Sequence, residues 1–205
     1  MKSEMSSKTD ARQRMIKAAF NLFHERGIHA TSIDAVLESS RTGKSQFSHY
    51  FKTKNGLVDA VLRQFLDELK KGAYDPVRSI RSWKDLDIWM RSFPRWQHNV
   101  KCTLACPIGT IANDLSQGHK GLRREIRQIF AWRRAFIADF FRREQDAGRM
   151  RKKFTPRTLA DFCYTITQGG LYMAKAERDI KPFENALDTA LVYLLSLRIP
   201  TKKRV

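Results

Sequence analysis

The sequence predicts an all-α protein. Apolar residues return every three or four positions along most of the chain, which is the period of a helix with one buried face. Capping residues, glycines and prolines divide this pattern into segments of helical length, and no segment shows the alternation of a strand. The 205 residues, 42% of them hydrophobic, are enough to bury the core of one large domain or two small ones.

Four helices are predicted in the first third of the chain. Their signals are an apolar stripe over residues 10–26 that ends at Gly27, and helix starts at Thr31-Ser32, near Gly43 and at Thr53. The second and third helices are short and separated by a turn of a few residues. This order is that of a helix-turn-helix, whose second helix enters the major groove of DNA.

Five further helices follow. The first is rich in aromatic residues and is expected to kink or end at Pro94, and the next opens at Pro107 and stops by Gly118. The last three are predicted over residues 120–146, 156–178 and 182–198, and the final TKKRV is expected to be a frayed tail.

The chain is strongly basic, with a net charge of +18 and a pI near 10.2. Such a charge favours a nucleic acid, acidic lipid headgroups or an acidic ligand as partner. Residues 1–56 hold 10 Lys and Arg against 5 Asp and Glu, a net of +5, whereas residues 117–157 hold 13 against 4, a net of +9. The larger excess therefore lies outside the helix-turn-helix, and ordinary solvated helix surfaces would also account for it.

The segments that direct a chain to a membrane are not apparent. No apolar run approaches the roughly 18 residues of a membrane helix, and the N-terminus has no apolar signal segment. The cysteines, Cys102, Cys106 and Cys163, are too few for a disulfide framework. We expect a soluble cytoplasmic protein with reduced thiols, without a cofactor or a membrane partner.

The stretch Gly43-Lys44-Ser45 has two interpretations. It resembles the end of a phosphate-binding loop, but that motif requires a glycine at position 38, where the chain has Glu38. The segment before it is predicted to be a helix and not a strand. The stretch is therefore better interpreted as the start of the DNA-reading helix.

This interpretation gives a set of candidate DNA contacts. Gln46 can pair with adenine and Lys44 can reach guanine or a phosphate, while Phe47 and Phe51 are expected to pack the helix against its neighbours. The predicted DNA-binding residues are Thr31, Arg41, Thr42, Gly43, Lys44, Ser45, Gln46, His49, Tyr50 and Lys54.

Residues 11 to about 65 resemble the DNA-binding domain of the tetracycline-repressor-like (TetR) family. The matching stretches are MIKAAFNLFHERGIHATSIDAVLE and GKSQFSHYFKTKNGLVDAVL. The resemblance implies a homodimeric repressor with a DNA-binding domain, here residues 1–56, and an inducer-binding and dimerisation domain, here residues 57–205. The chain departs from the family pattern at four positions. Arg41 replaces the common turn glycine, and Thr42 replaces a small hydrophobic residue. Ser45 replaces a glycine and Ser48 a tyrosine, so the operator contacts are expected to differ from those usual in the family.

The C-terminal half is more loosely similar to the N-ethylmaleimide-responsive branch of this family. The family pairs its last two helices with those of a partner, and the small residues Ala160, Thr167, Gly169 and Gly170 would permit a close approach. The leucines Leu187, Leu191, Leu194 and Leu195 would complete that seam, although a core within one chain would use the same residues.

Two candidate sites follow in this half. An apolar cavity for a small-molecule inducer is predicted from Trp89, Phe93, Trp96, Phe130, Phe136 and Tyr172, which would otherwise be plain core. Cys106, beside Pro107 at a helix start, is a candidate thiol sensor assisted by Lys175, or else an inert small residue. A metal site on His98, Cys102 and Cys106 is disfavoured because no fourth ligand is apparent.

Two other function classes stay open at this point. A cysteine-dependent enzyme would use Cys106 or Cys102 with His98, and a basic membrane-surface or RNA-binding protein would use residues 117–157. Neither explains the order of the helices in residues 10–69.

Overall fold

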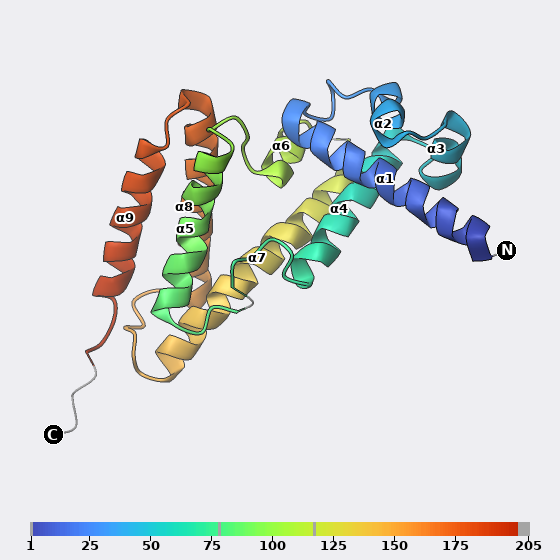
Figure 1. Cartoon of the computed structure of the whole chain (residues 1–205). Coiled ribbons are helices and arrows are strands. Elements are labelled where there is room, and N and C mark those ends of the chain that lie inside the picture. Colours follow the sequence, from blue (N-terminus) through green and yellow to red (C-terminus); the bar gives the residue numbers. More distant parts are fainter. Residues whose placement is uncertain (1, 78, 117, 201–205) are drawn as a thin grey trace. The chain divides into compact units, whose positions relative to one another are not determined.

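The computed structural model describes residues 2–77, 79–116 and 118–200, so the predicted tail TKKRV lies outside the described residues. Within these ranges the chain is helical and forms no strand, which confirms the all-α prediction. The helices are α1 (Lys2–Arg26), α2 (Ile33–Ser40), α3 (Lys44–Tyr50), α4 (Lys54–Lys70), α5 (Trp83–Asn99), α6 (Pro107–Asn113), α7 (Lys120–Asp146), α8 (Pro156–Glu177) and α9 (Lys181–Ser196) (Figure 1).

Contacts within the chain divide it into two compact units. Unit 1 contains the residues up to 71 together with 106–128, and unit 2 contains residues 72–105 together with those from 129 onward. Helix α7 is continuous and supplies residues to both. The functional boundary expected after residue 56 stays a prediction, since these units are defined by packing alone.

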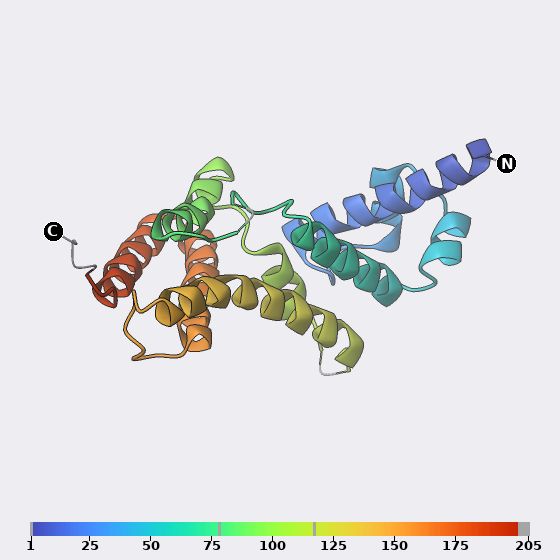
Figure 2. The same ribbon diagram turned by 90° about the horizontal axis from the view of Figure 1, so that it is seen from below.

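Unit 1 is built around α1 and α4, which lie side by side (Figures 1 and 2). Met15, Phe23, Leu57 and Leu62 are fully buried along them. Helix α1 begins at Lys2, earlier than the predicted start at residue 10. The apolar stripe that marks a helix in a sequence is confined to the part that packs, so it does not reveal such an extension.

Helix α6 is fastened to the turn that follows α1. The backbone N–H of His29 donates to the Asp114 carboxylate at 3.2 Å, and its ring Nε2 lies 2.9 Å from the Asp114 carbonyl oxygen. Gly27 sits in the left-handed region with φ +83°, and a Cβ there would lie 2.4 Å from the same carboxylate. Only glycine satisfies both the conformation and the close approach.

Unit 2 packs α5 and the second part of α7 through aromatic rings. Trp83 contacts Phe140 edge-on at 5.2 Å, and its indole N–H donates to Glu144 at 2.8 Å. Burial raises the pKa of Glu144, but hydrogen bonds from Arg149 and Trp83 outweigh it and hold that pKa below its usual value. Helix α5 continues through Pro94 to Asn99. Of the two expected outcomes at Pro94, an end of the helix is excluded, and the kink stays a prediction.

Helices α8 and α9 pack closely on each other. Thr167 is fully buried, and a Cβ on Gly170 would lie 1.9 Å from the ring of Phe183, so Gly170 gives the two helices room to pack within one chain. Leu187 and Leu194 are fully buried in the same core. Much of the predicted dimer seam therefore serves the core of the chain itself.

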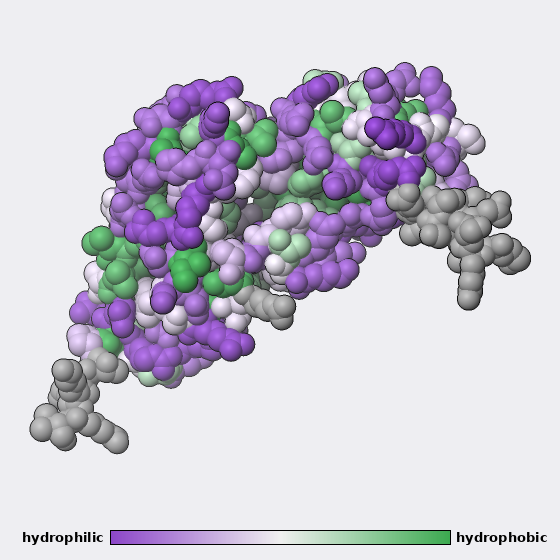
Figure 3. Space-filling model, viewed as in Figure 1, coloured by the Kyte–Doolittle hydropathy of each residue, from purple (hydrophilic) through white to green (hydrophobic). Residues whose placement is uncertain are grey.

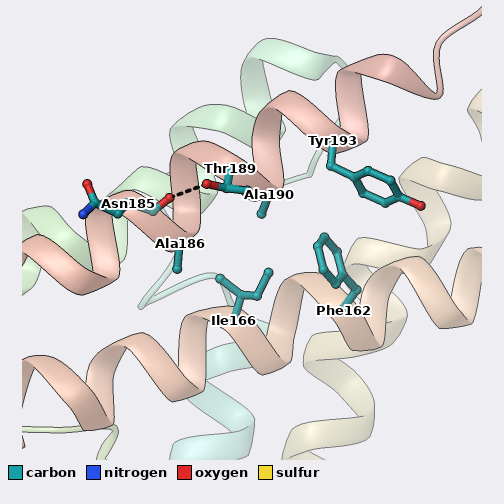
Figure 4. Close-up of a pocket in the computed structure, with 7 residues that line it drawn as sticks. All are labelled: Phe162, Ile166, Asn185, Ala186, Thr189, Ala190 and Tyr193. Atoms are coloured by element: carbon teal, nitrogen blue, oxygen red, sulfur yellow. Dashed lines mark hydrogen bonds between the residues drawn. The ribbon is translucent and has the colours of Figure 1, made fainter.

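The other side of α8 and α9 exposes large hydrophobic residues. Figure 3 shows hydrophobic surface over the C-terminal half of α9, where Val192 is 70% exposed. A groove of about 620 Å³ runs between the two helices, where Phe162 and Ile166 of α8 point towards Tyr193 and neighbouring residues of α9 (Figure 4). The exposed hydrophobic residues of α8, α9 and the residues directly after α9, hereafter the apolar face, are Tyr172, Met173, Val192, Tyr193, Leu195 and Ile199.

Among the described residues, no helix has the length and apolar character needed to cross a membrane.

Candidate nucleic-acid interface

The entry to α2 is fixed by two neighbouring hydroxyl groups. The Ser32 side chain caps the helix by accepting the Ala35 N–H at 3.0 Å. Thr31 is 1% exposed, and its hydroxyl donates to the Gly27 carbonyl at 2.8 Å. The Thr31 side chain therefore has almost no surface to offer to DNA, unlike the other predicted contact residues. A start signal for a helix does not distinguish a capping hydroxyl from a buried one.

The turn between α2 and α3 is closed by backbone hydrogen bonds around Arg41. The amides of Arg41 and Thr42 donate to the carbonyls of Glu38 and Leu37 at 3.1 and 3.0 Å. Arg41 lies in the left-handed region, with φ 52° and ψ 53°, a conformation that favours glycine. These hydrogen bonds hold Arg41 in its strained conformation, with its side chain on an exposed turn directly before α3.

Helix α3 presents a polar surface on one side and a ring on the other. Lys44, Ser45, Gln46 and His49 are exposed, whereas Phe47 is buried. The ring of Phe47 packs on that of Phe51 at 5.7 Å, and Phe51 is buried too. The predicted packing role of both phenylalanines is confirmed, and the polar side of α3 is available to a partner.

The start of α3 uses the side chain of Gln46. Its Oε1 accepts the backbone N–H of Gly43 at 3.1 Å, which satisfies one of the unpaired amides of a helix N-terminus. The Nε2 group keeps its two N–H donors. The bidentate adenine pair predicted for Gln46 also requires Oε1, so with the cap in place Gln46 acts mainly as a donor.

The other predicted contacts lie close to this helix. Lys44 forms an ion pair with Asp34 at 3.3 Å, but both side chains are more than two-thirds exposed and such a pair contributes little. Thr42 and Tyr50 are half-buried, and Lys54 is half-buried at the first position of α4. Thr53 caps that helix by accepting the Gly56 N–H at 3.0 Å. Apart from Thr31, the predicted residues therefore surround α3 with exposed or half-exposed side chains.

The predicted ligand-binding aromatics do not form one group. Trp89 is fully buried, donates its indole N–H to Asp75 at 3.0 Å and packs edge-on against Phe93 at 4.9 Å. Phe136 lies near Trp89, with ring centroids 6.5 Å apart, while Phe130 packs on Tyr164. The remaining two predicted residues differ in exposure, since Trp96 is half-buried and Tyr172 is 60% exposed on the apolar face.

The three thiols have different surroundings. Cys106 caps α6, is half-buried, and its Sγ accepts the Gly109 N–H at 3.5 Å. Cys102 and Cys163 are buried, and burial raises the pKa of Cys163 far above its usual value. Lys175, the predicted assistant of Cys106, is half-buried on α8 in unit 2, whereas Cys106 belongs to unit 1.

Two family models match the chain. Residues 15–61, which include the helix-turn-helix, match bacterial regulatory proteins of the tetR family, and residues 85–190 match the tetracyclin repressor-like C-terminal domain. The chain belongs to the TetR family of DNA-binding transcriptional repressors. The resemblance inferred from residues 11 to 65 is thus confirmed, and it extends through unit 2.

Individual TetR relatives are distant in sequence. The HTH-type transcriptional repressor DhaR of Mycobacterium sp. (strain GP1) is 24% identical over 198 residues, which cover 92% of this chain and 94% of that protein. The reduced form of NemR from E. coli has a TM-score of 0.78 at 17% identity, covering 94% of this chain and all of that one. A TetR-family regulator from Cytophaga hutchinsonii has a TM-score of 0.80 at 12% identity, covering 95% of this chain and 98% of that one. These structural likenesses concern the fold.

Within this TetR protein, Arg41 gives a prediction in which stability and DNA affinity change in opposite directions. Arg41→Gly is expected to raise the free energy of unfolding by about 1 kcal/mol because it removes a side chain from the left-handed region. It is also expected to weaken DNA binding and lower the slope of log K against log salt by about 0.9, the loss of one phosphate contact. Urea unfolding and gel shifts at several salt concentrations measure the two effects.

Arg41→Ala is the matched control, because it removes the guanidinium but keeps a Cβ in the strained conformation. It should weaken DNA binding without the gain in stability. An Arg41→Gly variant that binds DNA as well as wild type would exclude Arg41 from the interface.

Proposed function

We propose that the protein is a homodimeric repressor that leaves its operator when a small-molecule inducer binds unit 2 or when the thiol of Cys106 is modified. The observation that carries the DNA-binding part is the polar side of α3, which is exposed while Phe47 holds the opposite side in the core. The proposal that the protein is a dimer rests on the apolar face of α8 and α9.

The polar side of α3 suits the major groove of DNA. Its N-terminal residues include Lys44 and Gln46, and backbone N–H groups at a helix start attract a phosphate. Gln46, with its oxygen committed to the cap, would donate from Nε2 to an acceptor on a base edge. Lys54 and Arg41 would bind phosphates on either side and set the position of α3 without reading sequence.

The apolar face suits a second copy of the chain. A monomer rarely leaves many large hydrophobic side chains in water, and these residues come from two adjacent helices and the segment directly after α9. A face of this kind packs on itself around a two-fold axis. A dimer would also place two copies of α3 so that they can reach successive turns of the major groove.

An inducer would act by changing the balance between two forms of the dimer. It can do so only if it binds one form more tightly than the other. The form that it favours would hold the two α3 helices at a spacing that does not match successive major grooves, and the operator would be released.

The DNA-binding part is tested by selecting a site from random duplex DNA and measuring two variants on it. Gln46→Ala should reduce discrimination at one base position by about 1 kcal/mol, the contribution of a single hydrogen bond. Lys54→Ala should weaken binding to all sequences alike and flatten the salt dependence. Gel-shift titration measures both, and wild-type affinities for both variants would rule out these contacts.

The thiol part predicts an order of reactivity. Cys106 is half-buried, whereas Cys102 and Cys163 are buried. Because thiolate is the reactive form, the raised pKa of Cys163 makes it the slowest to react near neutral pH. Limiting maleimide followed by peptide mass mapping should show modification in the order Cys106, Cys102, Cys163. After maleimide treatment, the operator affinity of the wild type should fall and that of Cys106→Ser should stay unchanged. Labelling of Cys163 before Cys106 would contradict the proposal that Cys106 is a sensor.

A further inference from the structure

Unit 2 contains a second cavity, separate from the groove on the apolar face. It has a volume of about 270 Å³ and lies between the segment before α5 and the second part of α7. Its lining residues are Ser79, Ile80, Trp132, Ala135, Phe136, Asp139 and Arg143. Of the aromatic residues predicted to bind a ligand, Phe136 lines it, and Trp132 was not among those predicted.

Two aromatic rings of α7 line this cavity. Trp132 and Phe136 lie one turn apart on α7, and their rings stack with centroids 5.8 Å apart and planes at 16°. Ile80 is buried and Ala135, being small, leaves the space beside the rings open. A planar aromatic ring can pack against such a pair, and the volume limits the ligand to one or two fused rings.

One side of the cavity carries an arginine whose position is fixed. Arg143 donates one hydrogen bond to the carbonyl oxygen of Ile80 and another to the carboxylate of Asp139. A guanidinium has five N–H donors in a rigid plane, so Arg143 keeps donors for a ligand while two of them hold it in place. The arrangement is that of a preorganised site for a carboxylate.

The surrounding charges favour an anion. Arg142 donates a hydrogen bond to the Asp139 carboxylate at 2.9 Å, the same carboxylate that Arg143 contacts. Arg81 donates to the Ser79 hydroxyl at 2.9 Å. Asp85 accepts the backbone N–H of Arg81 at 2.9 Å. Three guanidinium groups and two carboxylates therefore lie in or beside the cavity, and Arg143 and Asp139 are the two that line it. Arg142 and Arg143 also belong to the basic segment 117–157, whose charge the operator contacts leave unexplained.

We infer that this cavity binds a small planar aromatic carboxylate, with the ring packed against the stacked pair of Trp132 and Phe136 and the carboxylate paired with Arg143. Its role as the inducer rests on the function proposed above, whereas binding itself does not. Such a ligand would contact residues 132–143 of α7, a helix whose residues 120–128 belong to the unit that carries α3.

The binding test uses naphthalene-2-carboxylate as the probe, titrated into the full-length protein by calorimetry. The wild type should bind it, and the neutral analogue naphthalene-2-methanol should bind at least about tenfold more weakly because it cannot form the charged pair. Arg143→Gln should weaken the acid by a similar factor, and Ala135→Trp, which fills the space beside the rings, should abolish binding. Arg142→Gln is the matched control, since it removes the same charge from a residue that does not line the cavity.

Three results would overturn the inference: no binding of the acid at millimolar concentration, equal affinity for acid and alcohol, or equal losses for Arg142→Gln and Arg143→Gln. Circular dichroism checks that each variant is folded. Gel shifts on the selected operator then separate the two claims. Failure of the protein to bind any DNA contradicts the proposed repressor, whereas binding of the acid with unchanged operator affinity contradicts only its role as inducer.

Discussion

Val192→Asp is expected to convert the proposed dimer into a folded monomer and to lower operator affinity by roughly 100-fold. Val192 is 70% exposed in the single chain, so a charge there costs the monomer little. In a dimer formed through the apolar face the same carboxylate would lose its water without gaining a partner. The operator affinity falls because each monomer then binds one half-site by itself. Linking two binding modules in one dimer raises the overall affinity by roughly 100-fold or more, and the monomer loses this gain.

Light scattering gives the mass and gel shifts give the affinity. Leu191→Asp is the matched comparison, because Leu191 is adjacent on α9 but only 8% exposed. A charge at Leu191 should unfold the chain and not merely separate two copies, which circular dichroism distinguishes. A Val192→Asp protein that keeps a dimeric mass at micromolar concentration would place the dimer interface elsewhere.

The helix-turn-helix could be predicted in detail because its signals are local. Ser32 and Thr53 accept amides three residues ahead of them, and Gly27 adopts the left-handed conformation that ends α1. Each of these depends on residues within a few positions, so the sequence alone is sufficient to recognise them. Phe47 could be assigned to the core for the same reason, since its spacing from Phe51 follows one helix turn.

The sites that require distant segments were not predictable in this way. In unit 2 the carbonyl oxygen of Ile80 accepts a hydrogen bond from Arg143, 63 residues further along the chain. The cavity lined by Trp132 exists only because these two distant segments lie together. Phe136 is among the aromatics predicted to bind a ligand and Trp132 is not, and a stripe of aromatics at helical spacing predicts plain core equally well. The same limit applies to Thr31, whose burial depends on how the turn after α1 folds back.

The two sides of α8 and α9 illustrate a further limit. Small residues permit close packing of any two helices, and the sequence does not say whether the second helix belongs to the same chain. Gly170 meets Phe183 of its own α9, so its small size serves the fold. Val192 and Tyr193, which helical spacing places outside the leucine stripe, form the surface that a partner can reach.

Gly170→Ala is therefore expected to destabilise the fold, by about 1–3 kcal/mol, although alanine is the better helix former. The added Cβ would lie 1.9 Å from the ring of Phe183, and both residues are buried, so α8 and α9 must move apart or the ring must leave its position. Gly169→Ala is the matched control, since its Cβ meets no atom within 4 Å, and it should be neutral or stabilising by up to about 1 kcal/mol.

Combining Gly170→Ala with Phe183→Ala separates this clash from other causes. Phe183→Ala alone leaves a cavity and is destabilising, but in the double variant the new methyl group occupies space that the ring has vacated. The loss for the pair should thus be smaller than the sum of the two single losses, by about 1 kcal/mol or more. Urea unfolding at one protein concentration gives all four free energies, and the fixed concentration keeps the contribution of dimer formation comparable. Additive losses, or a Gly170→Ala protein as stable as wild type, would mean that Gly170 is not held against Phe183.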